Sequence, residues 1–202
     1  MAYTHDIFIS YRRDPETVTW IQDHFVPLLR LRLGHELKNP PDIYIDQRIE
    51  AGATWPVDLG RELAQTKVLI SLWSGNYLHS KWCTLELAHM VAREEKFQLR
   101  TPQNSSGIVF FMVAHDGEKI PNTLQAIQKI EIQSCFNVRM RRDSPRAEEL
   151  DAILAKNASA IARAIEDAPE FKKEWPIEFA QNFFDQFHQK NPPSQSVVPQ
   201  FT

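Results

Sequence analysis

The sequence predicts an α/β domain built on a parallel sheet, and three observations lead to this fold class. Short apolar runs alternate along the chain with longer segments whose apolar residues recur at helical spacing. The short runs are rich in Ile, Val, Phe and Tyr and lack polar alternation, which favours strands that are covered on both faces. Strands that alternate with helices imply right-handed crossovers between parallel neighbours.

The elements follow in chain order. Predicted strands span residues 6–11, 42–46, 67–73 and 107–114, and a weaker fifth strand spans 129–133. Predicted helices span residues 17–37, 80–97 and 148–165. Ligands of such sheets bind beyond the carboxyl ends of the strands. The predicted site therefore lies among residues 10–14, 47–58, 74–82 and 115–121. The second of these stretches is long for a connection, so it is either a functional lid or an irregular loop.

The last part of the chain differs in composition. Aromatic residues recur every four positions in a predicted helical extension at 169–190, namely Phe171, Trp175, Phe179, Phe183 and Phe187. This stripe either packs on its own domain or serves a partner. Residues 191–202 are Pro/Ser-rich, which is typical of a tail or of a linker to a further domain. The main domain is expected to end at residue 168, so that it spans 1–168.

Composition and charge exclude several classes of function. The 202 residues carry a formal net charge of −3, with no basic footprint for direct nucleic-acid binding. No apolar run approaches the roughly 18 residues that a membrane span needs. The first ten residues lack the features of a secretory signal, and the two cysteines are far apart in the sequence. We therefore expect a cytoplasmic protein with no membrane contact.

Several kinds of site are absent from the sequence. The six glycines form neither G-x-G-x-x-G nor a P-loop, so a nucleotide bound as a reusable cofactor is not expected. His79 and Cys83 stand four residues apart, but no second ligand pair accompanies them. We expect neither a metal nor a cofactor.

One pair of residues stands out at the start of the second predicted helix. Trp82 and Glu86 are four apart and therefore share a helical face near the predicted crevice. A carboxylate beside an indole in a cleft is partly desolvated, which tunes it for acid/base chemistry. Spacing alone leaves the alternative open that Glu86 lies on a solvated face and Trp82 in the core.

Several motifs together resemble a Toll/interleukin-1 receptor (TIR) domain, in the style of the bacterial and plant branches. They are the opening DIFISYRRD, the strand DIYID, the strand VLISLWS and the element S-x-W-C-x-x-E-L at residues 80–87. The resemblance covers residues 4–167. It implies a flavodoxin-like three-layer sandwich with a central five-stranded parallel sheet.

The resemblance also implies a substrate and site residues. In enzymatic members the Glu of this motif, here Glu86, is needed to break the bond between nicotinamide and ribose in NAD+. Residues of the neighbouring loops and of the motif would bind this substrate: Ser10, Tyr11, Arg12, Arg13, Arg48, Trp55, Ser74, Tyr77 and Trp82. Arg12 and Arg13 would meet the diphosphate or form surface salt bridges, and Trp82 would stack on a base or wall the pocket.

Two functions follow as hypotheses. The first is an NAD+ nucleosidase that releases nicotinamide together with ADP-ribose or a cyclic ADP-ribose signal in bacterial anti-phage immunity. The second is a non-catalytic module that binds other TIR domains. In either case we expect a homo-oligomer formed through TIR–TIR contacts, and a sensor or effector as a separate protein or a fused domain.

Overall fold

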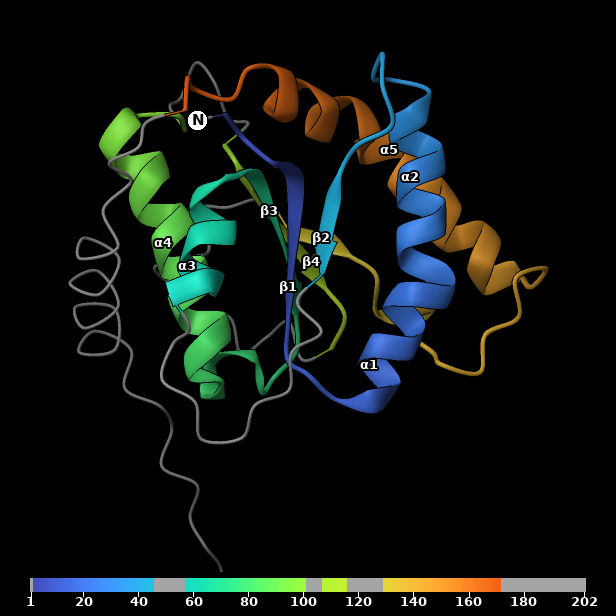
Figure 1. The fold of residues 1–202 in the computed structure, drawn as a ribbon. Coiled ribbons are helices and arrows are strands. Elements are labelled where there is room, and N and C mark those ends of the chain that lie inside the picture. Colours follow the sequence, from blue (N-terminus) through green and yellow to red (C-terminus); the bar gives the residue numbers. More distant parts are fainter. Residues whose placement is uncertain (1, 46–56, 101–106, 116–128, 172–202) are drawn as a thin grey trace, which may run out of the picture.

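The computed structural model of the chain describes residues 2–45, 57–100, 107–115 and 129–171. Five strands form one parallel sheet in the order β2-β1-β3-β4-β5, so the predicted five-stranded flavodoxin-like sheet is confirmed (Figure 1). The strands are β1 His5–Tyr11, β2 Ile43–Ile45, β3 Thr66–Trp73, β4 Val109–Val113 and β5 Lys129–Glu131. Each of them overlaps a predicted strand.

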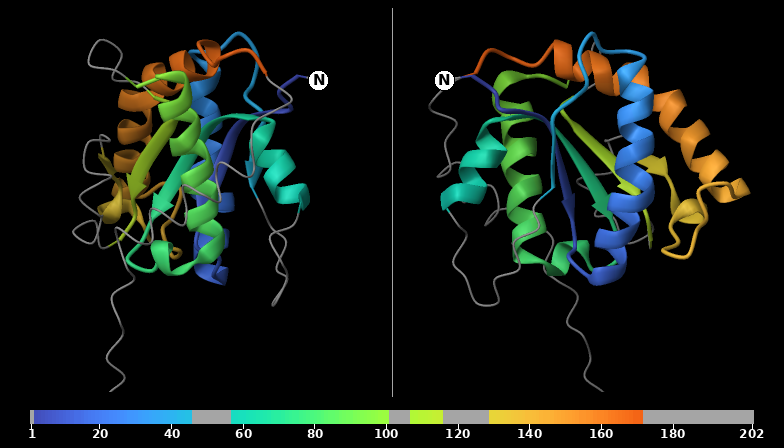
Figure 2. Two further views of the ribbon diagram at one scale, coloured as in Figure 1. Left: turned by 90° about the vertical axis from the view of Figure 1, so that its left-hand side faces the viewer. Right: turned by 45° about the vertical axis from the view of Figure 1, so that its right-hand side comes forward.

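Helices cover both faces of the sheet (Figures 1 and 2). One face carries α1 Pro15–Trp20, η1 Ile21–Phe25, α2 Val26–Gly34 and α5 Pro145–Glu166, and the other carries α3 Val57–Ala64 and α4 Lys81–Phe97. Side chains alternate along each strand between two apolar cores. Ile7 and Ile9 of β1 pack toward α2 and α5, whereas Phe8 packs toward α4. Even-numbered residues of β1 therefore face α4.

The predicted helix at 17–37 consists of three helical segments. Asp14 caps α1 by accepting a hydrogen bond from the Thr17 amide at 2.8 Å, and Pro15 occupies the first turn. The π-helical segment η1 ends at Phe25, two residues before Pro27. Proline has no amide hydrogen to donate to the carbonyl four residues earlier, so the helix widens there instead of breaking.

The helix α3 had not been predicted. Its first two residues, Val57 and Asp58, fall in the stretch that the sequence indicated as a loop. The helix has only eight residues and contains Gly60. Glycine is a poor helix former, and a helix this short depends on packing against the rest of the fold.

Only the first residues of the predicted extension at 169–190 are described. The Tyr3 hydroxyl donates a hydrogen bond to the Pro169 carbonyl at 2.7 Å, and the Phe171 ring meets Tyr3 edge to face at 5.5 Å. The rest of the aromatic stripe and the tail at 191–202 lie outside the described residues, so both remain predictions.

Two buried charges fix the second half of α4. The Arg93 guanidinium donates hydrogen bonds to the carbonyls of Thr66 at 2.7 Å and of Leu63 at 3.3 Å, which ties α4 to the end of α3. The Glu94 carboxylate accepts from the Val109 amide at 2.8 Å and pairs with Arg100 at 2.9 Å, which ties α4 to the start of β4. Because these groups are buried and hydrogen-bonded, they hold the helix in one position on the sheet.

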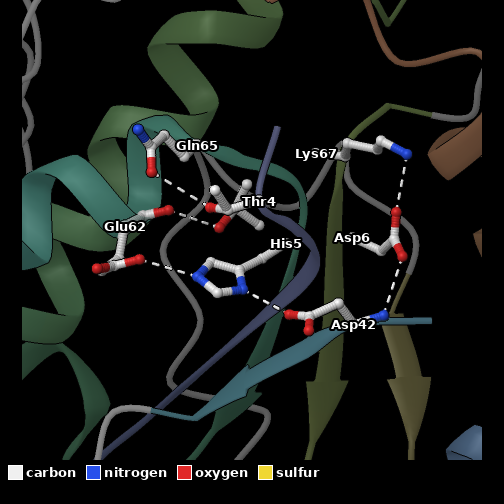
Figure 3. A network of polar contacts seen from close by, with 8 residues as sticks. Thr4, His5, Asp6, Asp42, Glu62, Gln65 and Lys67 are labelled. Atoms are coloured by element: carbon white, nitrogen blue, oxygen red, sulfur yellow. Dashed lines mark hydrogen bonds and ion pairs between the residues drawn. The ribbon is translucent and has the colours of Figure 1, made fainter. Parts of the chain in front are cut away.

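A polar network closes the amino ends of the strands (Figure 3). The His5 ring lies between two carboxylates, with Nδ1 bonded to Asp42 and Nε2 bonded to Glu62 at 2.8 Å. The Tyr44 ring packs beside it at 4.9 Å. Burial lowers the pKa of His5, but the hydrogen bonds and charges of Asp42 and Glu62 outweigh burial and leave that pKa raised. Protonated His5 of β1 thereby connects its strand to Asp42, which precedes β2, and to Glu62 of α3.

His5→Gln is expected to remove a stabilisation that depends on pH. A raised folded-state pKa contributes stability that is complete below the ordinary value of about 6.5 and disappears as pH rises through the raised value. The urea midpoint of the wild type should therefore exceed that of the variant in mild acid, and the gap should narrow in mild alkali. A constant gap across this range would show that His5 is not titrating between its two carboxylates.

Candidate active site

The candidate site lies where the direction of strand order changes. The chain leaves the carboxyl end of β1 toward α1 on one face of the sheet, and it leaves β3 toward α4 on the other face. The two strands are neighbours, and Ser10 of β1 pairs in register with Ser71 of β3. In a sheet of this order the switch point between β1 and β3 is where a ligand binds.

Glu86 lies in the second turn of α4, over this switch point. Ser80 caps the helix and accepts a hydrogen bond from the Cys83 amide at 3.4 Å, which sets where the helix begins. The Glu86 side chain is enclosed, and the residue is only 4% exposed. The alternative of a solvated Glu86 is therefore wrong.

One hydroxyl group contacts the enclosed carboxylate, and a second hydroxyl contacts the first. The Ser10 hydroxyl donates a hydrogen bond to Oε2 of Glu86 at 2.5 Å, and the hydroxyls of Ser10 and Tyr77 are also 2.5 Å apart. Ser10 is an even-numbered residue of β1 and therefore points toward α4. Ser10 is 67 positions from Tyr77 and 76 positions from Glu86 along the chain, so these contacts form only in the folded protein.

The environment of Glu86 favours its neutral form more than water does. Burial raises the pKa of Glu86 to about 7, against the Ser10 hydrogen bond and the positive charge of Arg13, which both lower it. Such a carboxyl group changes its charge near neutral pH. A perturbed carboxyl at a strand-end crevice is typical of a functional site.

The neighbouring titratable groups keep their protons at neutral pH. Burial raises the pKa of Tyr11 to about 12, and burial also raises the pKa of Tyr77 and of the Cys83 thiol. The negative charge of Glu86 adds to the rise in each case. Glu86 is therefore the group of this cluster that can carry a negative charge near pH 7.

The other predicted substrate-binding residues are distributed around this centre. Tyr11 is buried at the end of β1, Arg12 is exposed, and Arg13 is partly buried and acts electrostatically on Glu86. Ser74 begins the turn in which its carbonyl accepts from the Tyr77 amide at 2.8 Å. Direct contact of these side chains with a ligand stays a prediction.

Three further predicted site residues are Trp82 in the first turn of α4 and Arg48 and Trp55 in the stretch 47–58. Trp82 is partly buried and packs on the apolar cluster that includes Phe8 and Trp73, as a pocket wall would. Its part in ligand binding stays a prediction. Arg48 and Trp55 lie outside the described residues, so their predicted roles stay predictions as well.

The sequence interpretation overlooked two residues at this site. Ser71 lies beside Ser10 in the sheet, and its side chain acts on Tyr77: burial raises the pKa of Tyr77, and a hydrogen bond with Ser71 partly lowers it. Trp73 is buried and stacks on Tyr77 with ring centroids 5.2 Å apart. A serine within the apolar run KVLISLW was the signal that could have identified Ser71, because such a hydroxyl faces a buried polar neighbour or loses its hydrogen bonds.

A second candidate ligand site lies away from Glu86. A cavity of about 600 Å³ is lined by Tyr3, Asp6, Lys38 and Lys67 together with the end of α5. It opens at the amino ends of β1 and β3, opposite to Glu86, and is therefore separate from the switch point. Within the described ranges, no three His, Cys, Asp or Glu side chains gather in a way that could hold a metal ion. Nor does any helix there combine the length and the apolar character that crossing a membrane takes.

A family model matches most of the chain. Residues 7–150 match the family model described as TIR domain. The chain is 28% identical over 96 residues to the TMV resistance protein N of Nicotiana glutinosa; the match covers 48% of this chain and 8% of that protein. It also aligns with the TIR domains in the structure of the activated Roq1 resistosome directly recognizing the pathogen effector XopQ. That alignment has a TM-score of 0.39 and 17% identity, and it covers 77% of this chain and 84% of that chain.

Proposed function

The chain belongs to the TIR domain family, and on that premise we propose that it cleaves the bond between nicotinamide and ribose in NAD+. The observation that carries this proposal is the enclosed Glu86 carboxyl at the β1/β3 switch point, with a pKa of about 7. It combines a group that can bear negative charge with a position where this type of sheet binds ligands.

The proposed reaction is compatible with a single carboxylate. The bond between ribose C1′ and the nicotinamide nitrogen breaks, and its electron pair leaves with the nitrogen. The positively charged ring becomes neutral nicotinamide, so no group has to protonate it. Positive charge develops on the ribose, as in glycoside cleavage. A buried carboxylate close to that charge stabilises it strongly, because water does not screen the attraction.

The products depend on what captures the ribosyl cation. Attack by water gives ADP-ribose and a proton, and attack by a nitrogen of the adenine gives a cyclic ADP-ribose, which contains one water molecule less than ADP-ribose. In both cases NAD+ is consumed as a substrate. Arg13 acts on the charge of Glu86 from the loop after β1. We assign to it, together with the exposed Arg12, the role of binding the diphosphate.

The proposed setting is bacterial anti-phage immunity within the cytoplasm, where NAD+ is lost or a signal is made. We propose that the active form is a homo-oligomer held by TIR–TIR contacts and triggered by a sensor or effector. The sensor or effector is either a separate protein or a fused domain. The match with the TMV resistance protein N covers only 8% of that protein, so most of that relative lies outside the matched domain.

Assembly and catalysis are tested together by varying the protein concentration. Nicotinamide release per unit of protein is expected to rise as concentration or a crowding agent drives self-association. The measurement is chromatographic release of nicotinamide, with the oligomeric state followed by light scattering. Release that is proportional to protein across the assembly range would contradict the role of assembly. No release from any assembled form would contradict the enzyme and favour the non-catalytic interaction module.

A further inference from the structure

Ser10 and Tyr77 form a part of the site that has no access to a ligand in this structure. Both residues are 0% exposed, in contrast to Ser74 and Arg13 on the neighbouring loops. Their hydroxyls are 2.5 Å apart, and Ser10 is also 2.5 Å from Oε2 of Glu86. Any effect of these hydroxyls on a substrate therefore passes through the carboxyl of Glu86.

When Glu86 is charged, the direction of both hydrogen bonds in the series Tyr77–Ser10–Glu86 is fixed. A carboxylate only accepts, so the Ser10 hydroxyl gives its single hydrogen to Glu86. The Ser10 oxygen then still accepts one hydrogen bond, which the Tyr77 hydroxyl supplies. A hydroxyl that itself accepts a hydrogen bond is polarised and becomes a better donor. Tyr77 thereby strengthens the bond from Ser10 to Glu86.

The Tyr77 ring is held firmly enough to act in this way. It stacks on Trp73 with ring planes 27° apart, and Trp73 meets Phe111 of β4 edge to face at 5.7 Å. Its backbone amide is bonded to the Ser74 carbonyl in the turn after β3. A phenol fixed at both its ring and its backbone presents its hydroxyl at one place, so the geometry of the chain does not depend on a mobile side chain.

We propose that Tyr77 and Ser10 are positioning residues, a buried hydroxyl relay that delivers one hydrogen bond to Oε2 of Glu86 and fixes the orientation of its carboxylate at the switch point. The catalytic part of this inference rests on the proposed function, but the relay itself is a property of the folded chain. The electrostatics agree with it: burial raises the pKa of Glu86, and the Ser10 hydrogen bond partly reverses that rise. Loss of the relay is therefore expected to move the pKa further upward.

The test uses Ser10→Ala, Tyr77→Phe and a matched control, Thr66→Val. Tyr77→Phe keeps the ring on Trp73 and removes only the hydroxyl, so it tests the relay even if Ser10→Ala folds poorly. Thr66 is also a buried residue of β3, but it lies at the amino end of the strand, where its hydroxyl donates a hydrogen bond to the Glu62 carbonyl at 2.7 Å. Thermal unfolding of each variant measures whether the fold is kept.

Two readouts separate the relay from the reaction. The first is titration of the Glu86 carboxyl by infrared spectroscopy without substrate, assigned by subtracting the spectrum of Glu86→Gln. The second is the acid limb of nicotinamide release against pH. Ser10→Ala should move both midpoints upward by roughly one pH unit, the scale of one charge-assisted hydrogen bond. Tyr77→Phe should move them in the same direction by less, and Thr66→Val should leave them unchanged.

Each outcome decides one part of the inference. Unchanged infrared midpoints in Ser10→Ala and Tyr77→Phe would overturn the relay, whether or not the protein releases nicotinamide. A shifted infrared midpoint with no nicotinamide release from the wild type would support the relay and contradict the proposed function. A shifted infrared midpoint with an unmoved acid limb would overturn the catalytic part of the inference.

Discussion

Glu86→Gln is expected to lower nicotinamide release from NAD+ by roughly a hundredfold to a thousandfold, the range found when one preorganised electrostatic group is removed from an active site. Gln has nearly the same shape as Glu and can still accept the hydrogen bond from Ser10, but it carries no charge. The ribosyl cation would then lose the negative charge that stabilises it. The expected change is mainly in kcat, because this interaction strengthens as the bond breaks.

The matched control is Glu95→Gln. Glu95 is on the same helix, and its substitution makes the same change in net charge. It is exposed and lies nine residues after Glu86, about two and a half helical turns away. Its release rate should equal that of the wild type. Equal rates in Glu86→Gln and the wild type would remove Glu86 from the mechanism, whereas equal losses in both variants would indicate a general effect of charge.

The same substitution is expected to stabilise the fold in neutral and alkaline solution. The pKa of Glu86 is raised by burial from 4.5 to about 7. A raised folded-state pKa means that the acid form is favoured by folding, so this contribution is complete below the unfolded value and is lost as pH rises through the folded value. Gln at position 86 has no charge to desolvate. We therefore expect Glu86→Gln to exceed the wild type in unfolding free energy by up to about 3 kcal/mol above pH 7.

Urea unfolding in mild acid and in mild alkali measures this difference. Near pH 3.5 the two proteins should be almost equally stable, because Glu86 is then mainly protonated in both the folded and the unfolded wild type. The gap should begin to grow near the unfolded pKa of 4.5. The gap should then grow across the following two to three pH units, as the roughly linear dependence of the linkage relation requires. A gap that does not change with pH would show that Glu86 is not an enclosed, titrating carboxyl. Gained stability with lost activity is the pattern expected of a group retained for function.

Much of the fold was predictable because it depends on local patterns. The apolar runs at β1, β3 and β4 and the helical periodicity of α4 and α5 correspond to elements that the structure contains. The short helix α3 was missed, because its eight residues include Gly60 and depend on contacts with α4. The π-helical turn before Pro27 also escaped prediction, since it arises from a missing donor within an otherwise regular helix.

The site was only partly predictable, since its chemistry depends on strand register. The four-residue spacing between Trp82 and Glu86 indicated a shared helical face but did not show whether Glu86 is solvated. The burial of Glu86 depends on the packing of α4 over the neighbouring strands β1 and β3. The contact between Ser10 and Glu86 joins residues 76 positions apart, and nothing local to either residue specifies it. Ser71 was overlooked for the same reason, because its neighbour Ser10 lies on another strand.

The most direct measurement of the central claim is product analysis of NAD+ after incubation with assembled wild-type protein and, in parallel, with Glu86→Gln. Chromatography with mass detection separates nicotinamide, ADP-ribose, cyclic ADP-ribose products and intact NAD+. The wild type is predicted to give nicotinamide and one ADP-ribosyl product in equimolar amounts, while the variant leaves NAD+ almost entirely intact. Intact NAD+ from both proteins, or equal nicotinamide from both, would contradict the assignment of this chemistry to Glu86.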